Sequence, residues 1–281
     1  MEGARNATCN VHVFPHLSVQ GLERRLKRIR GEHPEAGILV VTESLFSMDS
    51  DTPDITAHQK LARDYGATLM VDAAHDLGCM GPTGRGHLEM QGMLGKVDLL
   101  MGSFSKTFAS NGGFVATHHP ALKQALRYAC GPLTFSNAIS PVQASVVIKA
   151  LDIIQSPEGS NLRKAMMDNA VALREGLTKA GFQVMGDPSA IVPVILGESG
   201  RSRLITRFAL ERGGLVNLVE YPAVARNAAR FRLQVMATHT REQIDRFVSI
   251  LSGAVREADA VLANPGLIQV AVDSVRAEHT S

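Results

Sequence analysis

Three polar side chains that could do chemistry follow two short apolar runs of the sequence. Asp72 and His75 come directly after Leu69–Val71, and Lys106 lies just beyond Val97–Met101. Apolar runs of this length, bounded by turn residues, are typical of strands that are buried on both faces. Because ligands bind beyond the carboxyl ends of such strands, we expect a carboxylate, an imidazole and an amine to converge at one edge of a sheet.

This set of groups suits chemistry with pyridoxal phosphate. A lysine amine forms a Schiff base with a carbonyl cofactor, and pyridoxal phosphate proteins pair an acidic side chain with the pyridinium nitrogen. Lys106 and Asp72 are the candidates for these roles, with His75 near the phenolic oxygen of the ring and the Ser103 hydroxyl near the phosphate. A simpler interpretation stays open, because an aspartate after a strand often caps a helix and most lysines are solvated.

The elements that must position these residues alternate between helix and strand. The hydrophobic periodicity predicts a helix at 17–30, a strand at 38–41, a helix at 56–65 and strands at 69–71 and 97–101. This order predicts parallel neighbouring strands joined by right-handed crossovers. We therefore expect an α/β large domain with a mostly parallel sheet.

The large domain is expected to end with a strand at 114–117 and a helix at 141–155. This helix is expected to turn Val142, Val146, Ala150 and either Leu151 or Ile154 inward. A smaller α+β domain is predicted to follow. Residues 156–160 have the composition of a linker. Beyond them, the pattern predicts helices at 161–180 and 203–212, strands at 191–196, 214–219 and 229–236, a capping box at 240–243 that opens the last helix, and a frayed tail after 263. The expected domains are therefore a cofactor-binding large domain at 1–155 and a C-terminal small domain at 156–281.

The composition narrows the class of protein. The chain has 281 residues, of which 45% are hydrophobic and 20% are charged, and this balance is ordinary for a globular protein. A net charge of +2 gives no reason to expect nucleic acid as a partner. Three cysteines without a CxxC pair suit a reducing compartment, and no apolar run approaches the ~20 residues of a membrane helix. We therefore expect a cytoplasmic protein without a membrane span.

The sequence gives no reason to expect a metal site. The adjacent histidines His118 and His119 have no third ligand near them in the sequence, and a metal site needs one.

Several stretches resemble the α-oxoamine synthases, in fold-type I of the pyridoxal phosphate enzymes and close to the class II aminotransferases. They are Thr-Glu-Ser-Leu-Phe-Ser-Met-Asp-Ser-Asp (42–51), Val-Asp-Ala-Ala-His (71–75), Gly-Pro-Thr-Gly-Arg-Gly (81–86), Gly-Ser-Phe-Ser-Lys (102–106), Phe-Ser-Asn (135–137) and Ala-Arg-Phe-Arg-Leu (229–233). They occur in order along the chain. Some details resemble the serine palmitoyltransferase branch of the family, and Phe-Ser-Asn resembles the aminoketobutyrate CoA ligase branch.

The resemblance implies a reaction and a set of partners. It implies a transferase that uses pyridoxal 5'-phosphate to condense an amino acid with an acyl-CoA, with loss of carbon dioxide. It also implies a homodimer. Lys106 would be the lysine that binds the cofactor, Asp72 the partner of the pyridinium nitrogen, and His75 a contact of the phenolic oxygen that assists proton transfer.

The resemblance assigns four further positions in this sequence. Ser47 matches a contact near the cofactor ring, and Ser103 matches a contact on the phosphate side. Ser136 matches a hydroxyl that comes from the neighbouring subunit. Arg232 matches the arginine that holds the substrate carboxylate, a role suited to its forked guanidinium.

The sequence also departs from the family pattern. Ser44 and Ser50 replace common glycines, and Asp76 replaces a usual serine, which adds a negative charge that is expected near the ring edge. The resemblance begins at about Pro15. Members of the family have a longer N-terminal segment before this point, which holds a phosphate loop and a ring that stacks on the cofactor, and we expect this chain to lack both. A truncated, catalytically inactive subunit is therefore one alternative to the acyltransferase. A pyridoxal phosphate-dependent aminotransferase is another, because the same lysine, acid and arginine serve both reactions.

Overall fold

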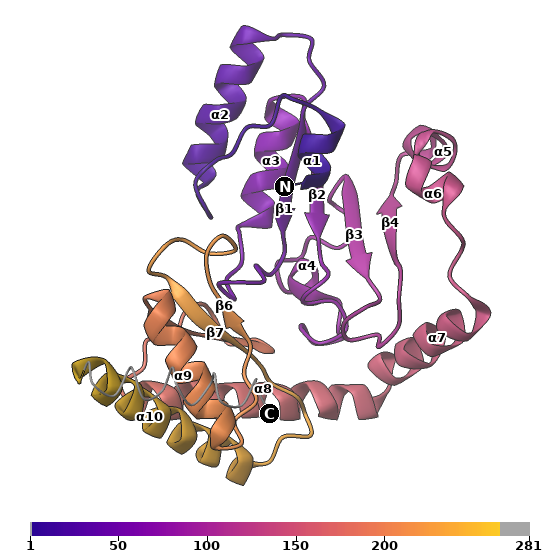
Figure 1. The fold of residues 1–281 in the computed structure, drawn as a ribbon. Helices are drawn as coiled ribbons and strands as arrows, with labels where there is room; N and C mark the ends of the chain where they lie inside the picture. The colour runs from indigo at the N-terminus through magenta and orange to yellow at the C-terminus, as the bar shows by residue number, and fades with distance from the viewer. Residues whose placement is uncertain (1, 265–281) are drawn as a thin grey trace. The chain divides into compact units, whose positions relative to one another are not determined.

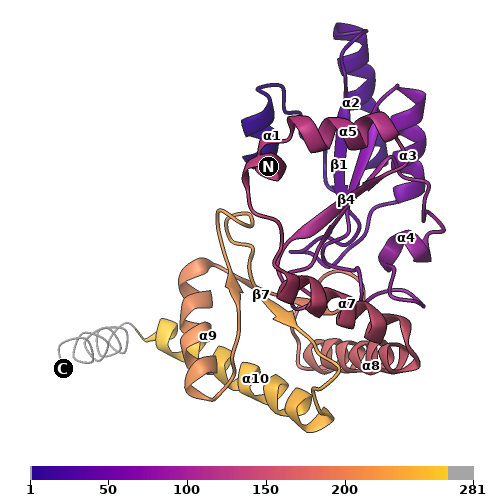
Figure 2. The same ribbon diagram turned by 90° about the vertical axis from the view of Figure 1, so that its right-hand side faces the viewer.

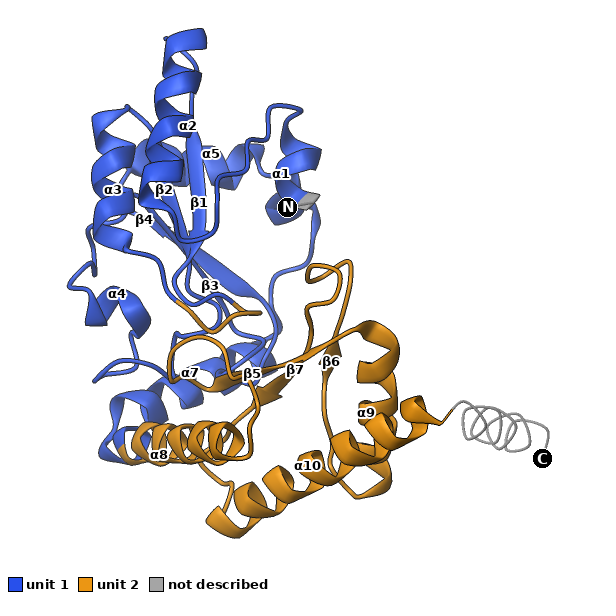
Figure 3. Cartoon of the chain, turned by 90° about the vertical axis from the view of Figure 1, so that its left-hand side faces the viewer, with its two compact units in different colours: residues 1–46, 52–160 blue, residues 47–51, 161–281 orange. Residues whose placement is uncertain are grey.

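The computed structural model describes residues 2–264, which form two compact units (Figure 3). Unit 1 comprises residues 1–46 and 52–160, and unit 2 comprises residues 47–51 together with the chain from residue 161 onward. The short segment 47–51 therefore lies with unit 2, although both of its sequence neighbours lie in unit 1.

Unit 1 is an α/β unit built on a four-stranded sheet (Figure 1). Its elements are α1 (Glu2–Ala7), α2 (Val19–Glu32), β1 (Leu39–Glu43), α3 (Ile55–Asp64), β2 (Thr68–Asp72), α4 (Gly86–Met90), β3 (Leu99–Ser103), β4 (Gly113–Thr117), α5 (Pro120–Ala129), α6 (Gly131–Phe135) and α7 (Pro141–Gln155). The strand order is β1-β2-β3-β4, in which the first three strands are parallel and β4 is antiparallel to β3. The predicted α/β class with a mostly parallel sheet is confirmed.

The two faces of this sheet differ in burial. One face packs against α2 and α3 and forms a core with Val40, Leu69 and Val71. On the opposite face Leu39 is 55% exposed and Val41 is 50% exposed. Because side chains alternate along a strand, the two runs β1 and β2 each place one row of apolar residues in the core and one row on this open face.

The helices that cover the core begin at capping residues. The Ser18 hydroxyl accepts a hydrogen bond from the backbone N–H of Gly21 at the start of α2, and the Asp54 carboxylate accepts one from Ala57 at the start of α3. Both helices carry apolar residues on one face only, which they bury against the sheet. The Gln91 side chain also binds the first turn of α3, since its Oε1 accepts from the N–H of Ile55 at 2.9 Å.

Unit 2 contains a second, smaller sheet (Figure 2). Its elements are the greater part of α8 (Pro157–Lys179), followed by β5 (Ile191–Gly197), α9 (Ser199–Glu211), β6 (Leu218–Val219), β7 (Ala229–Gln234) and α10 (Arg241–Ala263). The strand order is β5-β7-β6, and both pairings are antiparallel. Phe231 and Leu233 are buried on one face of β7, as the alternating sequence predicts, and Val235 just beyond the strand is also buried.

Three details of the sequence-based prediction are wrong. Residues 156–160 are not a linker, because α8 begins at Pro157. The predicted strand at 214–219 is reduced to the two residues of β6. In α7 the expected inward face is largely exposed: Val142 is 74% exposed, and only Val147 of this helix is buried.

The structure does not test two other expectations, which concern the C-terminal tail and the domain boundary. The predicted tail after residue 263 lies almost wholly outside the described residues, and the predicted domain boundary between 155 and 156 stays a prediction. None of the helices between residues 2 and 264 combines the length and the apolar character that a membrane crossing requires.

Candidate active site

Asp72 is the last residue of the central strand β2. It pairs in register with Glu43 of β1 on one side and with Met101 of β3 on the other. Its Oδ1 accepts a hydrogen bond of 2.9 Å from the N–H of Ala74, so the carboxylate also caps the turn that follows the strand. Residues that pair across a sheet point to the same face, which puts Asp72 on the open face, in the row of Met70.

His75 follows in this turn and lies near a second acid. Its Nδ1 is 3.7 Å from Oε2 of Glu43, and 20% of its side chain is exposed. Glu43 is not among the predicted site residues because the apolar pattern predicts a strand that ends at Val41, whereas β1 continues to Glu43. The structure thus adds a carboxylate to the predicted group, at the strand end next to Asp72.

Ser103 and Lys106 lie at the end of β3 and in the loop that follows it. The Ser103 Oγ is 2.7 Å from the Ser105 Oγ and accepts a hydrogen bond of 3.2 Å from the Ser105 N–H. The loop is closed by a bond of 2.9 Å from the Ser110 N–H to the Phe104 carbonyl. The Lys106 side chain is exposed and has no ion pair or hydrogen bond within the described part of the chain.

The strand ends bring part of the predicted set together. Because β1, β2 and β3 run parallel, their carboxyl ends share one edge of the sheet, where Glu43, Asp72 and Ser103 end neighbouring strands. His75 and Lys106 follow within three residues of those ends. This edge therefore collects carboxylate, imidazole, hydroxyl and amine groups.

The loop after His75 is held by a buried acid that sequence analysis placed elsewhere. We expected the Asp76 carboxylate near the ring edge, but Asp76 is fully buried. Its Oδ2 accepts hydrogen bonds from the N–H of His87 at 2.7 Å and from the His87 ring at 2.9 Å. A Cβ at Gly86 would lie 2.6 Å from the Asp76 carboxyl carbon, so only glycine leaves room for this contact.

Glu89 holds the other side of the same loop. Its carboxylate accepts hydrogen bonds from the Thr83 hydroxyl at 2.7 Å, from the Thr83 N–H at 3.0 Å and from the Arg85 N–H at 3.3 Å. Partial burial alone would raise the pKa of Glu89, but these hydrogen bonds outweigh burial and hold the pKa below its ordinary value. The glycine-rich segment 81–86 is therefore a fixed turn, as its composition predicts.

Ser136 stands apart from the groups at the sheet edge. It is exposed at the end of α6, and its hydroxyl donates a hydrogen bond to the carbonyl of Pro132. Within the described residues no hydrogen bond joins it to Asp72, His75 or Lys106.

Ser47 and Arg232 lie together in unit 2. The Arg232 Nε donates a hydrogen bond of 2.6 Å to the Ser47 carbonyl. The neighbouring Arg230 is buried and forms an ion pair with Asp49. Two arginines of β7 therefore hold the segment 47–51.

Ser50 fixes the same segment from its other end. It has a φ of +57°, a conformation that favours glycine, which accounts for the glycine that the family commonly has here. Its hydroxyl compensates by donating to the Asp187 carbonyl at 2.9 Å and by lying 2.8 Å from the Ser189 hydroxyl.

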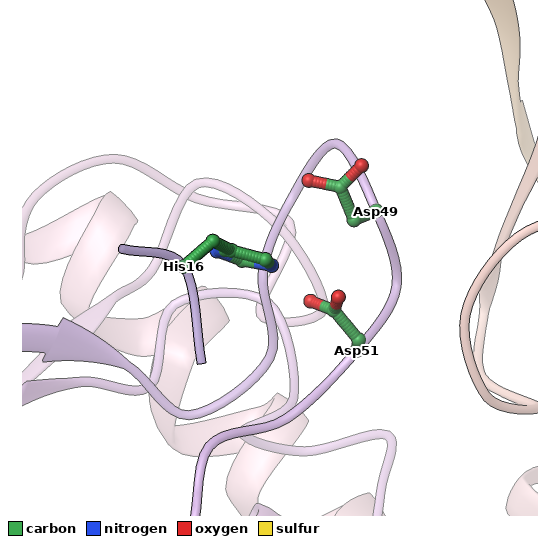
Figure 4. A group of neighbouring side chains, drawn as sticks. All are labelled: His16, Asp49 and Asp51. Carbon is green, nitrogen blue, oxygen red and sulfur yellow. The ribbon is translucent and has the colours of Figure 1, made fainter. Parts of the chain in front are cut away.

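Asp49 and Asp51 both lie on this segment, and Figure 4 shows their carboxylates. Together with His16 they have the donor types that a cation could use. However, Asp49 is ion-paired with Arg230, and His16 belongs to unit 1, so these residues do not form a metal site of either unit.

Comparison with known proteins identifies the family. The family model of class I and II aminotransferases matches residues 1–251. Among curated proteins, the chain is 33% identical over 259 residues to an 8-amino-7-oxononanoate synthase of Alkaliphilus metalliredigens. It is also 33% identical over 259 residues to a serine palmitoyltransferase of Bacteroides thetaiotaomicron. Each match covers 92% of this chain and 64% of the relative.

A solved structure agrees with the sequence comparisons. A serine palmitoyltransferase from S. paucimobilis, with bound pyridoxal phosphate and myriocin, has a TM-score of 0.84 and 32% identity. That match covers 92% of this chain and 64% of the other chain. The chain therefore spans a little under two thirds of the length of these relatives. The resemblance to the α-oxoamine synthases and the fold-type I assignment are confirmed, and the chain belongs to the family of class I and II aminotransferases.

Proposed function

We propose that this chain carries the cofactor-binding edge of a pyridoxal phosphate-dependent acyltransferase of the α-oxoamine synthase type. The observation that supports it is the shared sheet edge, where Asp72 and Ser103 end neighbouring parallel strands and Lys106 follows in an open loop. The similarity to 8-amino-7-oxononanoate synthase and serine palmitoyltransferase supports the same reaction class.

The residues present fit pyridoxal phosphate. Lys106 offers an exposed amine that no carboxylate of the described residues occupies, and an amine of this kind can bond to the carbonyl carbon of the cofactor. Asp72 uses Oδ1 to bind the Ala74 N–H, which leaves Oδ2 for the pyridinium nitrogen. His75 would bind the phenolic oxygen, and the Ser103 hydroxyl would bind the phosphate.

The bound cofactor supplies an electron sink for negative charge at the α-carbon of an amino acid. Asp72 would keep the ring nitrogen protonated, and this positive charge would make the ring a better acceptor of that electron density. Lys106 would then move the proton at the α-carbon. His75, oriented beside Glu43, is placed to hold a proton near the oxygen that becomes negatively charged.

Arg232 and Ser47 are proposed to act on substrate and cofactor from unit 2. Arg232 keeps its Nε on the Ser47 carbonyl, which orients the guanidinium for a carboxylate ligand. In the proposed reaction the α-carbon of the amino acid attacks the carbonyl carbon of an acyl-CoA, the thiol of CoA leaves, and the substrate carboxylate departs as carbon dioxide. The product is an α-amino ketone.

The cofactor assignment can be tested directly. The chain is incubated with pyridoxal phosphate, reduced with borohydride, digested and analysed by mass spectrometry. We expect the cofactor to be fixed on Lys106, no fixation in Lys106→Ala, and normal fixation in the control Lys123→Ala, which changes an exposed lysine of α5. Fixation on other lysines alone, or none at saturating cofactor, would contradict the proposal and favour the inactive subunit.

A second assay distinguishes the acyltransferase from an aminotransferase. The aminotransferase is the alternative because the matching family is that of class I and II aminotransferases. The chain with cofactor is given an acyl-CoA and glycine, alanine or serine, and free thiol is measured. Thiol release that depends on the amino acid supports the acyltransferase. Transfer of the amino group to a keto acid, without thiol release, would assign the chain to the alternative.

We also propose that the working protein is a cytoplasmic homodimer in which Ser136 contributes to the partner's site. The exposed apolar residues around Ser136 support an interface there, since Phe135 is 91% exposed. Cys9, Cys79 and Cys130 form no disulfide in the described part of the chain, and this supports a reducing compartment. Ser136→Ala is expected to weaken cofactor binding without lowering the unfolding temperature.

A further inference from the structure

A groove of about 700 Å³ lies in unit 2 between the end of α9 and the face of α10. Its lining is rich in guanidinium groups: Arg212 comes from the end of α9, and Arg246 and Arg256 come from α10. The remaining lining residues are Ser249, Ile250, Gly253 and Glu257. Three cations thus face one carboxylate.

Two of the three arginines of this groove differ from the other arginines of α9 and α10 in that they lack an ion-pair partner among the described residues. On the same two helices Arg201 is paired with Asp259, Arg207 with Glu211, and Arg241 with Asp245. In the groove Arg212 binds Glu257.

Arg246 and Arg256 form no ion pair within the described part of the chain, although both are exposed side chains of the same helix. The groove therefore keeps two positive charges for which no carboxylate in the described part of unit 2 compensates.

The guanidinium groups lie near two glycines of the surrounding backbone, at distances that would still be ordinary van der Waals contacts for a Cβ. A Cβ at Gly253 would lie 3.4 Å from Nε of Arg212 and 4.0 Å from Nη2 of Arg256. A Cβ at Gly213 would lie 4.0 Å from Nη2 of Arg246. Arg212 is held in place, because its Nη1 donates a hydrogen bond of 3.0 Å to the Phe208 carbonyl.

We propose that this groove is a binding site for a multiply charged phosphate ligand, such as a diphosphate group. Planar guanidinium groups bind phosphate oxygens through paired N–H donors, and uncompensated arginines in a shared concavity favour a ligand with more than one negative charge. The Ser249 hydroxyl adds a neutral donor to the same surface. The free anion and the nucleotide end of coenzyme A share this chemistry.

Binding is measured by titration calorimetry of the full chain with pyrophosphate, coenzyme A and pantetheine, which has no phosphate. We expect saturable binding of pyrophosphate that weakens as sodium chloride is raised. The double variant Arg246→Gln/Arg256→Gln should lose about tenfold in affinity for each arginine removed. The control Arg241→Gln, on the same helix but paired with Asp245 outside the groove, should change affinity by less than about twofold.

The outcomes distinguish a free phosphate anion from the nucleotide end of coenzyme A. They also test the phosphate site independently of the proposed cofactor site at Lys106. Coenzyme A that binds tighter than pyrophosphate, and loses this advantage in the double variant, identifies the nucleotide end as the ligand. Equal affinities identify a free phosphate anion. No saturable pyrophosphate binding, or equal affinity of the double variant and the control, would overturn the site. Lys106→Ala should bind pyrophosphate normally, so a failure of the cofactor assignment leaves this test intact.

Discussion

At the scale of single residues, two carboxylates fix the loop that follows His75. Asp76 binds the backbone and ring of His87 from inside unit 1, and Glu89 binds Thr83 and Arg85 from the outer side. The sequence indicated that Asp76 was unusual, but it could not show where the carboxylate would point. That direction depends on Gly86, whose missing side chain opens the space that Asp76 fills.

The hydrogen bonds of Glu89 predict a pH-dependent stability. Because the pKa of Glu89 is lowered in the folded chain, its carboxylate stabilises the fold at pH above its unfolded pKa of about 4.5. This contribution is lost as the pH falls through the folded pKa. Glu89→Gln should therefore reduce the free energy of unfolding by about 1 kcal/mol at pH 7, and the difference from the unmodified chain should shrink progressively as the pH falls below about 4.5.

Urea unfolding followed by circular dichroism across this pH range measures the effect. The matched control is Glu35→Gln, since Glu35 is exposed and has no bonding partner within residues 2–264. A loss for Glu89→Gln that is constant from pH 7 to acid pH would show that the charge of Glu89 does not stabilise the loop.

At the scale of elements, patterns that depend on local burial were predictable and those that depend on distant contacts were not. β2 and β3 were found because their apolar runs are bounded by turn residues, and the capping box of Thr240 and Gln243 at the start of α10 is present. The start of α8 was mistaken for a linker because a proline at the first helical position and a nearby glycine also characterise linkers. Gly159 in fact allows a close approach, since a Cβ there would lie 2.2 Å from the Ile153 carbonyl.

The segment 47–51 packs so closely against Gly186 of unit 2 that one added methyl group at Gly186 should strongly reduce the free energy of unfolding. A Cβ at Gly186 would lie 2.0 Å from the Asp49 carbonyl and 2.4 Å from the Ser50 carbonyl. Gly186→Ala should cost about 3 kcal/mol or more, because backbone must move in addition to the strain of a positive φ. Gly181→Ala isolates that strain, since Gly181 has a φ of +87° with nothing near its Cβ position, and should cost about 1 kcal/mol.

Thermal unfolding of both variants measures the difference. Partial proteolysis should also cut the segment 47–51 faster in Gly186→Ala than in Gly181→Ala. Equal unfolding temperatures for the two variants would mean that the segment does not need its close contact with Gly186.

At the scale of the whole molecule, the described residues leave apolar surface uncovered. The open face of the unit 1 sheet exposes Leu39 and Val41, and α5 and α6 bury no residue at all. In α7 the helical spacing of apolar residues predicts a buried face, but the described residues leave most of that face exposed. Spacing alone does not tell which part of the protein, or which other chain, packs against such a face. The chain also spans only 64% of the 8-amino-7-oxononanoate synthase that it matches.

Exposed apolar residues around Ser136 predict that two copies of the chain associate through this region. Phe135 is 91% exposed and Val142 is 74% exposed, and a charge at either position would have to be desolvated in an interface. Sedimentation velocity should show a dimer of the unmodified chain and a monomer of Val142→Asp with an unchanged unfolding temperature. The control Leu215→Asp, which changes a residue of unit 2 that is 89% exposed, should remain a dimer. A dimeric Val142→Asp, or a monomeric unmodified chain that fixes cofactor on Lys106 at full occupancy, would remove α7 and Ser136 from the interface.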